Sequence, residues 1–313
     1  MTATSLLMSD PTPTAPPRDD RRLTIGMPLY NNAPTIRRAL DSLLAQTFRD
    51  FSILISDDGS TDGTPSICEE YARRDARITV VRQPRNLNYG NFRFVLRDAD
   101  TPFFMFAAGD DYWHPDYARR MIDVLDRQGD VVCAVSRVMF MKDGQQIAAA
   151  TGTRALESDR AENIARFLEA GDDNSRMYGV FRTDVARRAF PTRDFFGYDW
   201  AFSVGTLQFG KHVEVPDVMM WRDHTDPSRY IEYVRRDARG PLNRVLPMLQ
   251  LTKDVLLRLR IPITADTVKQ LLNLNLIFHF AYLRRYHPAA AAAGDRIRGG
   301  AARVVRTVLH RNR

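Results

Sequence analysis

The chain has 313 residues, of which 44% are hydrophobic and 27% charged, the composition of an ordinary soluble globular protein with room for one large α/β domain and an appendage. Two cysteines, Cys68 and Cys133, are too few for a secreted disulfide scaffold and favour a reducing, cytoplasmic compartment. The net charge is +7, but residues 229–313 carry 17 Lys and Arg against 5 Asp and Glu, so an acidic body precedes a basic C-terminal part.

Two apolar stretches are too short to be membrane segments. Leu6–Met8 makes no signal-peptide core and the run PTPTAPP soon follows it, so we predict that residues 1–21 form a disordered lead. Residues 271–283 (LLNLNLIFHFAYL) fall short of the ~18 apolar residues that a membrane span requires, because two asparagines and a histidine interrupt them. This second stretch is better explained as a buried or amphipathic helix.

Strands and helices alternate along the first half of the chain. The run FSILIS is apolar almost throughout, as expected for a strand that is buried on both faces of a parallel sheet. The expected strands are residues 23–27, 51–56, 78–81, 102–107 and 131–140, and the expected helices are residues 36–44, 65–74, 91–99 and 115–128. This alternation predicts an α/β fold, a mostly parallel sheet with helices on both faces.

Beyond residue 150 the pattern is looser. We expect helices over residues 184–190 and 199–209, an edge strand over residues 213–218, and three C-terminal helical segments, the last of them a basic helix over residues 296–310. We therefore divide the chain after the lead into an α/β domain, residues 22–228, and a basic α-helical extension, residues 229–313. The extension suits contact with an anionic surface; alternatively, its charges only face solvent.

Polar loops follow four of the expected strands. They are YNN (30–32), DDGSTDG (57–63), RNLNYGN (85–91) and GDD (109–111), all rich in Asp, Asn and Gly. In open α/β sheets, ligands bind just beyond the carboxyl ends of the strands. The agreement of four separate loops predicts one ligand site at that edge of the sheet.

The segment SDDGSTDGT (56–64) allows a metal, a nucleotide or a simple turn. Four residues of the segment, and Glu69 shortly after it, match a calcium-loop pattern. Asp58, Ser60, Asp62, Gly63 and Glu69 fall at its positions 1, 3, 5, 6 and 12. However, the preceding run is strand-like rather than helical. Pro65 also occupies a position at which that loop needs a backbone N–H. Calcium binding is therefore the weaker interpretation.

Nucleotide binding and helix capping are the other two interpretations of this segment. Asp58 can accept hydrogen bonds from a ribose hydroxyl or a base N–H, and the glycines that follow it permit close backbone approach. Asp62 or Thr64 can cap the next helix. These two interpretations are compatible, because they use different residues.

Four further residues are candidates for chemistry. The oxygens of Asp110 and Asp111, after the apolar strand PFFMF, suit Mg²⁺ or Mn²⁺, although GDD can also be a surface turn. Asp199 lies among five aromatic residues in FFGYDWAF, where lost solvation raises a carboxyl pKa and favours a general base, unless it caps a helix. His224 is either a metal ligand or a polar surface residue.

With these motifs in order, the chain resembles the family 2 glycosyltransferases of the GT-A fold. The matching motifs are TIGMPLYNN (24–32), ALDSLLAQTF (39–48), ISDDGSTDGT (55–64), NLNYGNF (86–92), FMFAAGDDYWHPD (104–116), GYDWAF (197–202) and VPDVMMWRDH (215–224). The resemblance covers residues 22–228, and the combination is specific although each motif alone is weak. A sugar-phosphate nucleotidyltransferase is disfavoured, because PLYNNAP is not the glycine-rich loop that such enzymes carry.

The resemblance implies inverting transfer from a nucleotide-diphosphate sugar to an acceptor hydroxyl, with Mn²⁺ or Mg²⁺. It implies Asp199 as the base, metal binding by Asp110, Asp111 and His224, and nucleotide-sugar binding by Pro28, Tyr30, Asn32, Asp58, Asn88, Asn91 and Asp110. Two positions depart from the commoner family pattern. Ala108 replaces the first Asp of Asp-x-Asp-Asp, and Tyr198 replaces the Glu that usually precedes the base.

The expected role is synthesis of a cell-surface polysaccharide or glycoconjugate, with a saccharide or lipid-linked acceptor and no nucleic-acid partner. The basic extension further suggests peripheral contact with anionic lipid at the inner face of the cell membrane. The alternative is a degenerate transferase that acts as a non-catalytic calcium- or nucleotide-binding module.

Overall fold

The computed structural model describes residues 21–170, 173–223, 232–236, 241–259 and 263–292. Three expectations therefore fall wholly or largely outside the described residues. They are the disordered lead, the basic helix over residues 296–310, and the metal-ligand role of His224.

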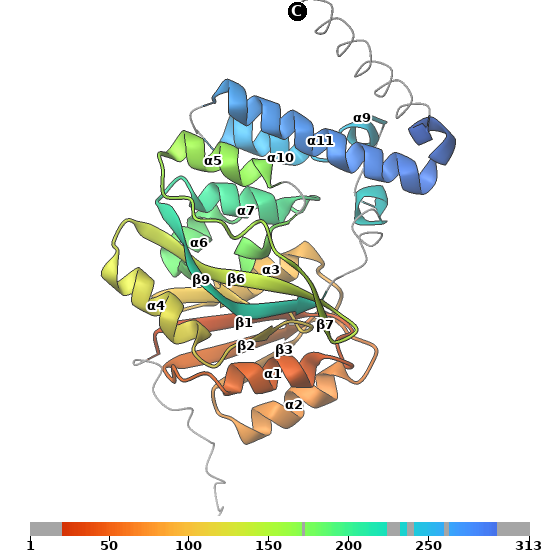
Figure 1. The fold of residues 1–313 in the computed structure, drawn as a ribbon. Helices are drawn as coiled ribbons and strands as arrows, with labels where there is room; N and C mark the ends of the chain where they lie inside the picture. The colour runs from red at the N-terminus through yellow and green to blue at the C-terminus, as the bar shows by residue number, and fades with distance from the viewer. Residues whose placement is uncertain (1–20, 171–172, 224–231, 237–240, 260–262, 293–313) are drawn as a thin grey trace, which may run out of the picture.

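Nine strands form a single mixed sheet in the order β3-β2-β1-β4-β8-β6-β9-β5, with β7 paired to β6 (Figure 1). The strands are β1 Leu23–Leu29, β2 Phe51–Asp57, β3 Ile78–Arg82, β4 Phe103–Phe106, β5 Tyr112–Trp113, β6 Val131–Lys142, β7 Gln145–Ala149, β8 Val180–Arg182 and β9 Lys211–Asp223. The first four strands pair in parallel, as does β6 with β9. The predicted α/β fold is confirmed, and its sheet is mixed: the other pairings, β4 with β8, β5 with β9, and β6 with both β7 and β8, are antiparallel.

Helices cover both faces of this sheet. They are α1 Ile36–Leu44, α2 Thr64–Arg74, α3 Tyr89–Arg97, α4 Tyr117–Arg127, α6 Thr183–Ala189 and α7 Tyr198–Thr206, while α5 Arg160–Glu169 packs with α7 in a separate cluster. One apolar cluster joins α1, α2 and α4 to the sheet, and a second joins α3, α6 and α7 to its other face. Strand β1 is buried along almost its whole length, which explains its continuous apolar sequence.

The sequence pattern does not predict β5, β7 and β8. It predicts β9 as an edge strand, whereas β9 lies between β6 and β5. β5 has two residues and β8 has three, too few for periodicity to appear. β8 also enters between β4 and β6 antiparallel to both. β9 runs well past the expected residues 213–218: Pro216 breaks its pattern, and the pairing with β6 shifts register there.

The C-terminal part forms a third layer over α5 and α7 (Figure 1). It comprises α9 Pro241–Val245, α10 Leu249–Lys253, a π-helical turn η3 Asp254–Arg258 and α11 Ala265–Tyr286. The side chain of Thr264 caps α11 by accepting from the Thr267 amide, so this helix starts before the expected residue 271. None of the described helices is long and apolar enough to cross a bilayer.

Candidate functional site

The first two predicted loops are bound to each other beyond the ends of β1 and β2. The amide of Asn31 donates to Ser60 Oγ (2.9 Å), that of Asn32 to Thr64 Oγ1 (2.7 Å) and that of Ala33 to Asp62 Oδ2 (3.0 Å). Asp62 Oδ1 also accepts from the amide of Thr64, the first residue of α2, so Asp62 serves the helix start as predicted. Both Asp62 oxygens are thus engaged by the backbone, which argues against the calcium interpretation.

Asp58 joins the second loop to the third. Its Oδ1 accepts from the Leu87 amide (2.6 Å) and its Oδ2 from the Asn88 amide (2.9 Å), and the residue is only 3% exposed. Burial raises the pKa of Asp58, and the two amides oppose this shift. The carboxylate therefore shapes the loop that leads into α3, and its direct contact with a nucleoside stays a prediction.

The other predicted nucleotide-binding residues differ in accessibility. Tyr30 is 50% exposed and Asn88 is exposed, so both side chains are available to a ligand. Pro28 is partly buried in β1, opposite Ser56 in β2, and Asn32 Oδ1 accepts from the Tyr30 amide. Asn91 is buried, and its amide group bonds the carbonyl and hydroxyl of Ser56. In this structure Asn91 stabilises the end of β2.

We expect Asp58→Ala to weaken nucleotide-sugar binding by loosening the third loop. It leaves two backbone amides without their charged acceptor, which should lower the free energy of unfolding by about 2 kcal/mol or more. Urea denaturation and calorimetric titration with the donor would measure both effects. Tyr30→Ala is the matched control, because this exposed side chain should affect binding without affecting stability. Equal stability of Asp58→Ala and wild type would contradict this role.

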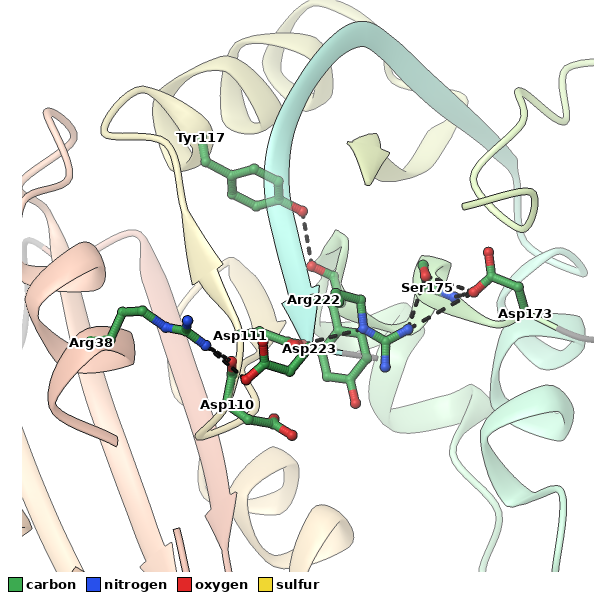
Figure 2. Close-up of polar contacts among 9 residues, drawn as sticks. Arg38, Asp110, Asp111, Tyr117, Asp173, Ser175, Arg222 and Asp223 are labelled. Atoms are coloured by element: carbon green, nitrogen blue, oxygen red, sulfur yellow. Dashed lines mark hydrogen bonds and ion pairs between the residues drawn. The ribbon is translucent and has the colours of Figure 1, made fainter. Parts of the chain in front are cut away.

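The GDD segment lies against the first loop and against the end of β9. A Cβ at Gly109 would come within 2.8 Å of Leu29 and Asn32 side-chain atoms, so the segment approaches that loop as only glycine allows. Strand β5, which follows, pairs antiparallel with β9. This pairing brings Arg222 and Asp223, at the end of β9, beside Asp110 and Asp111 (Figure 2).

Asp111 is engaged in a buried ion pair. It is 2% exposed, and Arg222 Nε donates to its Oδ2 at 3.3 Å. Burial raises the pKa of Asp111 to about 7, although the Arg222 charge acts in the opposite direction. The guanidinium of Arg222 also lies over the ring of Tyr178, 4.5 Å from its centroid, and donates to Ser175 Oγ at 2.9 Å.

Asp110 is the more available carboxylate of the pair. Arg38 donates to its backbone carbonyl (2.7 Å) and to Asp223 Oδ2 (2.9 Å), and the Asp110 carboxylate turns away from Arg38 and Arg222 in Figure 2. Within the described part of the chain, no other residue donates a hydrogen bond to this carboxylate. Burial raises the pKa of Asp110, partly offset by Arg222.

A divalent cation fits this edge of the site. The described residues contain no group of three or more His, Cys, Asp or Glu side chains that could hold a metal ion. The chain nevertheless offers a carboxylate with uncommitted oxygens at Asp110, and Mg²⁺ and Mn²⁺ prefer oxygen ligands. β9 ends at Asp223, directly before the predicted ligand His224.

Asp199 lies in the first turn of α7, after Gly197, whose φ of +87° favours glycine. Burial raises the pKa of Asp199 to about 6, against hydrogen bonds from Asn174 and from backbone amides. The neighbouring Tyr198 packs on Tyr89 with ring centroids 4.7 Å apart. The shift predicted from the aromatic neighbourhood is therefore present.

Sequence reasoning missed the residues that connect these parts. Asn174 Nδ2 donates to Asp199 Oδ2, while the flanking Asp173 and Ser175 both approach Arg222. The segment NSRMY carries no recognisable pattern, and nothing in the sequence pairs Arg222 with Asp111. The sequence feature that points to Arg222 is its place in the motif WRDH, two residues before His224.

The chain is similar to known proteins in sequence and in fold. The profile described as Glycosyl transferase family 2 matches residues 24–190. The uncharacterized glycosyltransferase EpsJ of Bacillus subtilis is 34% identical over 181 residues, 58% of this chain and 46% of EpsJ. The succinoglycan biosynthesis protein ExoW of Rhizobium meliloti is 40% identical over 104 residues, 31% of each chain. The matched part spans less than half the length of either relative.

Among solved structures, residues 1–349 of S. aureus TarS in complex with UDP-GlcNAc align with a TM-score of 0.56 at 18% identity, covering 82% of this chain and 80% of that one. This likeness confirms the predicted GT-A-type fold. The profile match covers more than half of the 313 residues and includes all four of the predicted loops, whereas β9 and Asp199 lie beyond its end. The chain therefore belongs to glycosyltransferase family 2.

Proposed function

We propose that the protein transfers a sugar from a nucleotide-diphosphate sugar to an acceptor hydroxyl, with inversion at the anomeric carbon. One observation carries this proposal. A continuous series of contacts runs from Asp111 through Arg222 to Ser175, and the adjacent Asn174 binds Asp199. The carboxylates suited to a donor-bound cation and a carboxylate suited to proton transfer therefore belong to one site.

On the donor side, we assign the nucleoside to the first three loops, with Tyr30 and Asn88 as its accessible contacts. The structural relative TarS was solved with UDP-GlcNAc, which makes a uridine-diphosphate sugar the first donor to test. Asp110, with His224, would hold Mn²⁺ or Mg²⁺ beside Asp111, which is engaged by Arg222. When bound, the cation would supply positive charge to the diphosphate leaving group.

On the acceptor side, Asp199 accepts the proton of the attacking hydroxyl. Its pKa of about 6 leaves it ionised at neutral pH yet more basic than an ordinary aspartate. The acceptor oxygen bonds the anomeric carbon as the bond to the diphosphate breaks on the opposite face, which inverts the configuration. Arg222 adds fixed positive charge close to Asp110, Asp111 and Asp199.

A thermal-shift screen of nucleotide-diphosphate sugars with Mn²⁺ tests this function. The true donor should raise the melting temperature only with the cation, by an amount equivalent to about 2.7 kcal/mol at 100-fold excess over Kd. EDTA should remove the shift, and Mn²⁺ or Mg²⁺ should restore it. Binding without any sugar transfer or donor hydrolysis would instead support the non-catalytic alternative. The absence of a shift with every donor would overturn the proposal.

We further propose a role in polysaccharide or glycoconjugate synthesis at the inner face of the membrane. The named role of ExoW supports the first part, and α11 supports the second. Leu272, Leu276 and Ile277 are 57%, 49% and 48% exposed, and Arg284 and Arg285 lie exposed in the last turn. Exposed apolar residues with basic neighbours suit the surface of an anionic bilayer.

Liposome flotation at low salt tests the membrane contact. We expect the protein to float with vesicles that contain anionic lipid and to be released as the salt concentration rises. Replacing Leu272 and Leu276 together by Asn should reduce flotation without changing the fold, because both side chains already face solvent. If the protein stays at the bottom of the gradient with anionic vesicles, the membrane contact is wrong and these residues contact another protein surface or only solvent.

A further inference from the structure

Asn174 forms a directed link between a buried serine and Asp199. Ser203 Oγ donates to Asn174 Oδ1 at 3.0 Å, and Asn174 Nδ2 donates to Asp199 Oδ2 at 3.3 Å. Asn174 is 7% exposed and Ser203 is fully buried. The amide cannot turn over at equal energy, because its oxygen would then face the carboxylate, with two acceptors opposed. The carboxylate of Asp199, which only accepts, therefore fixes which way the amide points, and Ser203 Oγ holds the amide oxygen in place.

The backbone on both sides of Asn174 is tightly held. Asp173 Oδ1 accepts from the amide and hydroxyl of Ser175 (2.8 and 2.6 Å), and its Oδ2 accepts from the Gly152 amide (2.7 Å). A Cβ at Gly152 would come within 2.2 Å of the Asp173 carbonyl oxygen, so this contact requires glycine. Ser175 Oγ also accepts from Arg222 (Figure 2). Asn174 is thus fixed relative to the arginine that binds Asp111.

We propose that Asn174 is a positioning residue for the base: it holds the Asp199 carboxylate at a fixed orientation and distance from the donor-binding carboxylates. The inference rests on the role proposed above for Asp199. A carboxylate that must take a proton from a bound hydroxyl gains from restricted rotation, because misplacement by about 1 Å costs roughly 10²-fold in rate. Hydrogen bonding to the ionised form also favours that form.

The effect of Asn174 on the pKa of Asp199 can be separated from the other influences on that pKa. The pKa of Asp199 depends on its burial, on hydrogen bonds from the Asn174 amide and from the backbone amides of Asp199 and Trp200, and on the charge of Arg222. Of these, the Asn174 amide and the Arg222 charge come from side chains that substitution can remove. Loss of the Asn174 donor should therefore raise the pKa of Asp199 and move the acid limb of the pH–rate profile to higher pH.

The test compares Asn174→Ala, Asn174→Asp and Ser203→Ala with wild type. We expect Asn174→Ala to lower kcat about 10–100-fold near pH 6, with recovery toward wild type at higher pH and a donor KM within about twofold. Asn174→Asp should shift the acid limb further, because it places a second carboxylate beside Asp199. Ser203→Ala should give a smaller shift in the same direction, since it only frees the amide to turn.

A structural role alone would predict a different result, namely a lower melting temperature and the same loss of kcat at every pH. An unchanged acid limb in Asn174→Ala and Ser203→Ala, with wild-type transfer intact, would overturn the inference and leave the proposed function standing. The side-chain carboxyl ¹³C resonance of Asp199 gives a readout that does not depend on turnover. If the titration midpoint of this resonance does not rise in either variant, the inference about Asn174 fails, whether or not transfer is detected. A lack of transfer by the wild-type protein, by contrast, counts against the proposed function.

Discussion

Replacing Asp199 with asparagine is expected to lower kcat by about 10²–10⁴-fold and to leave the affinity for the nucleotide sugar unchanged. This range is the usual contribution of a general base, and Asn has nearly the same shape but cannot accept the proton. Single-turnover sugar transfer and calorimetric titration of the donor would measure the two quantities. Asp184→Asn, an exposed change in the first turn of α6, is the matched control and should retain full activity.

The same assignment fixes the direction of the pH dependence. Because burial raises the pKa of Asp199 to about 6, the base is protonated below that pH, and kcat should increase as pH rises through about 6. The folded state also binds this proton more tightly than the unfolded chain. The resulting stability is present below the unfolded pKa and is lost as pH rises through about 6. Asp199→Asn should therefore be at least as stable as wild type at pH 7, and full turnover by this variant would refute the base assignment.

The second large effect on transfer is expected when Asp110 is replaced. Replacing Asp111 should instead mainly lower the stability of the protein. Asp110→Asn should lose transfer by about 10³-fold, because a bound cation contributes several kcal/mol to stabilising a leaving group. Its stability should be close to that of wild type, since no other described residue donates a hydrogen bond to the Asp110 side chain. Donor-induced thermal shifts in this variant should no longer respond to Mn²⁺ or EDTA.

Asp111→Ala is the informative comparison. It removes the carboxylate that accepts from Arg222 and leaves Asp173, 3.9 Å away, as the remaining carboxylate close to the guanidinium. Breaking a buried ion pair costs about 3–5 kcal/mol, and Asp173 should keep the loss toward the lower end of that range. Urea unfolding should show that loss, whereas Asp110→Asn should not. If Asp111→Ala is fully stable, or if Asp110→Asn keeps cation-dependent transfer, the division of roles between these two residues is wrong. This division also accounts for how a site with Ala108 in place of the first Asp of the commoner motif can retain a cation ligand.

The sequence predicted the elements whose pattern is long and regular. The apolar face of α1 and the continuous apolar runs of β1 and β2 correspond closely to the folded structure. The sequence places Asp58 in the loop after β2, but it does not reveal which groups bond to the Asp58 carboxylate. They are the backbone amides of Leu87 and Asn88, and backbone amides occur in every residue and leave no trace in sequence.

The connections within the site were harder to predict for a different reason. Arg222 meets Asp111 because the two-residue strand β5 pairs with β9, and so short a strand carries no periodicity. Asn174 lies directly before a single turn of 3₁₀ helix, Ser175–Tyr178, and the residues from Asp173 to Arg176 are polar and buried but form no repeat. A buried polar residue in an irregular segment is recognisable only when its partners are known.

Helix α7, which carries Asp199, shares its apolar cluster with the C-terminal helices. Trp200 packs edge-on against Phe278 of α11, with ring centroids 6.1 Å apart, and Leu251 and Leu274 are fully buried in the same cluster. A recombinant fragment that ends at residue 228 would therefore lack one wall around α7, and a fragment that ends at residue 190 would lack α7 itself. For the same reason, the C-terminal helices are not an exchangeable module: a chimera that borrows them from a relative must also match the residues of α5 and α7 on which they pack.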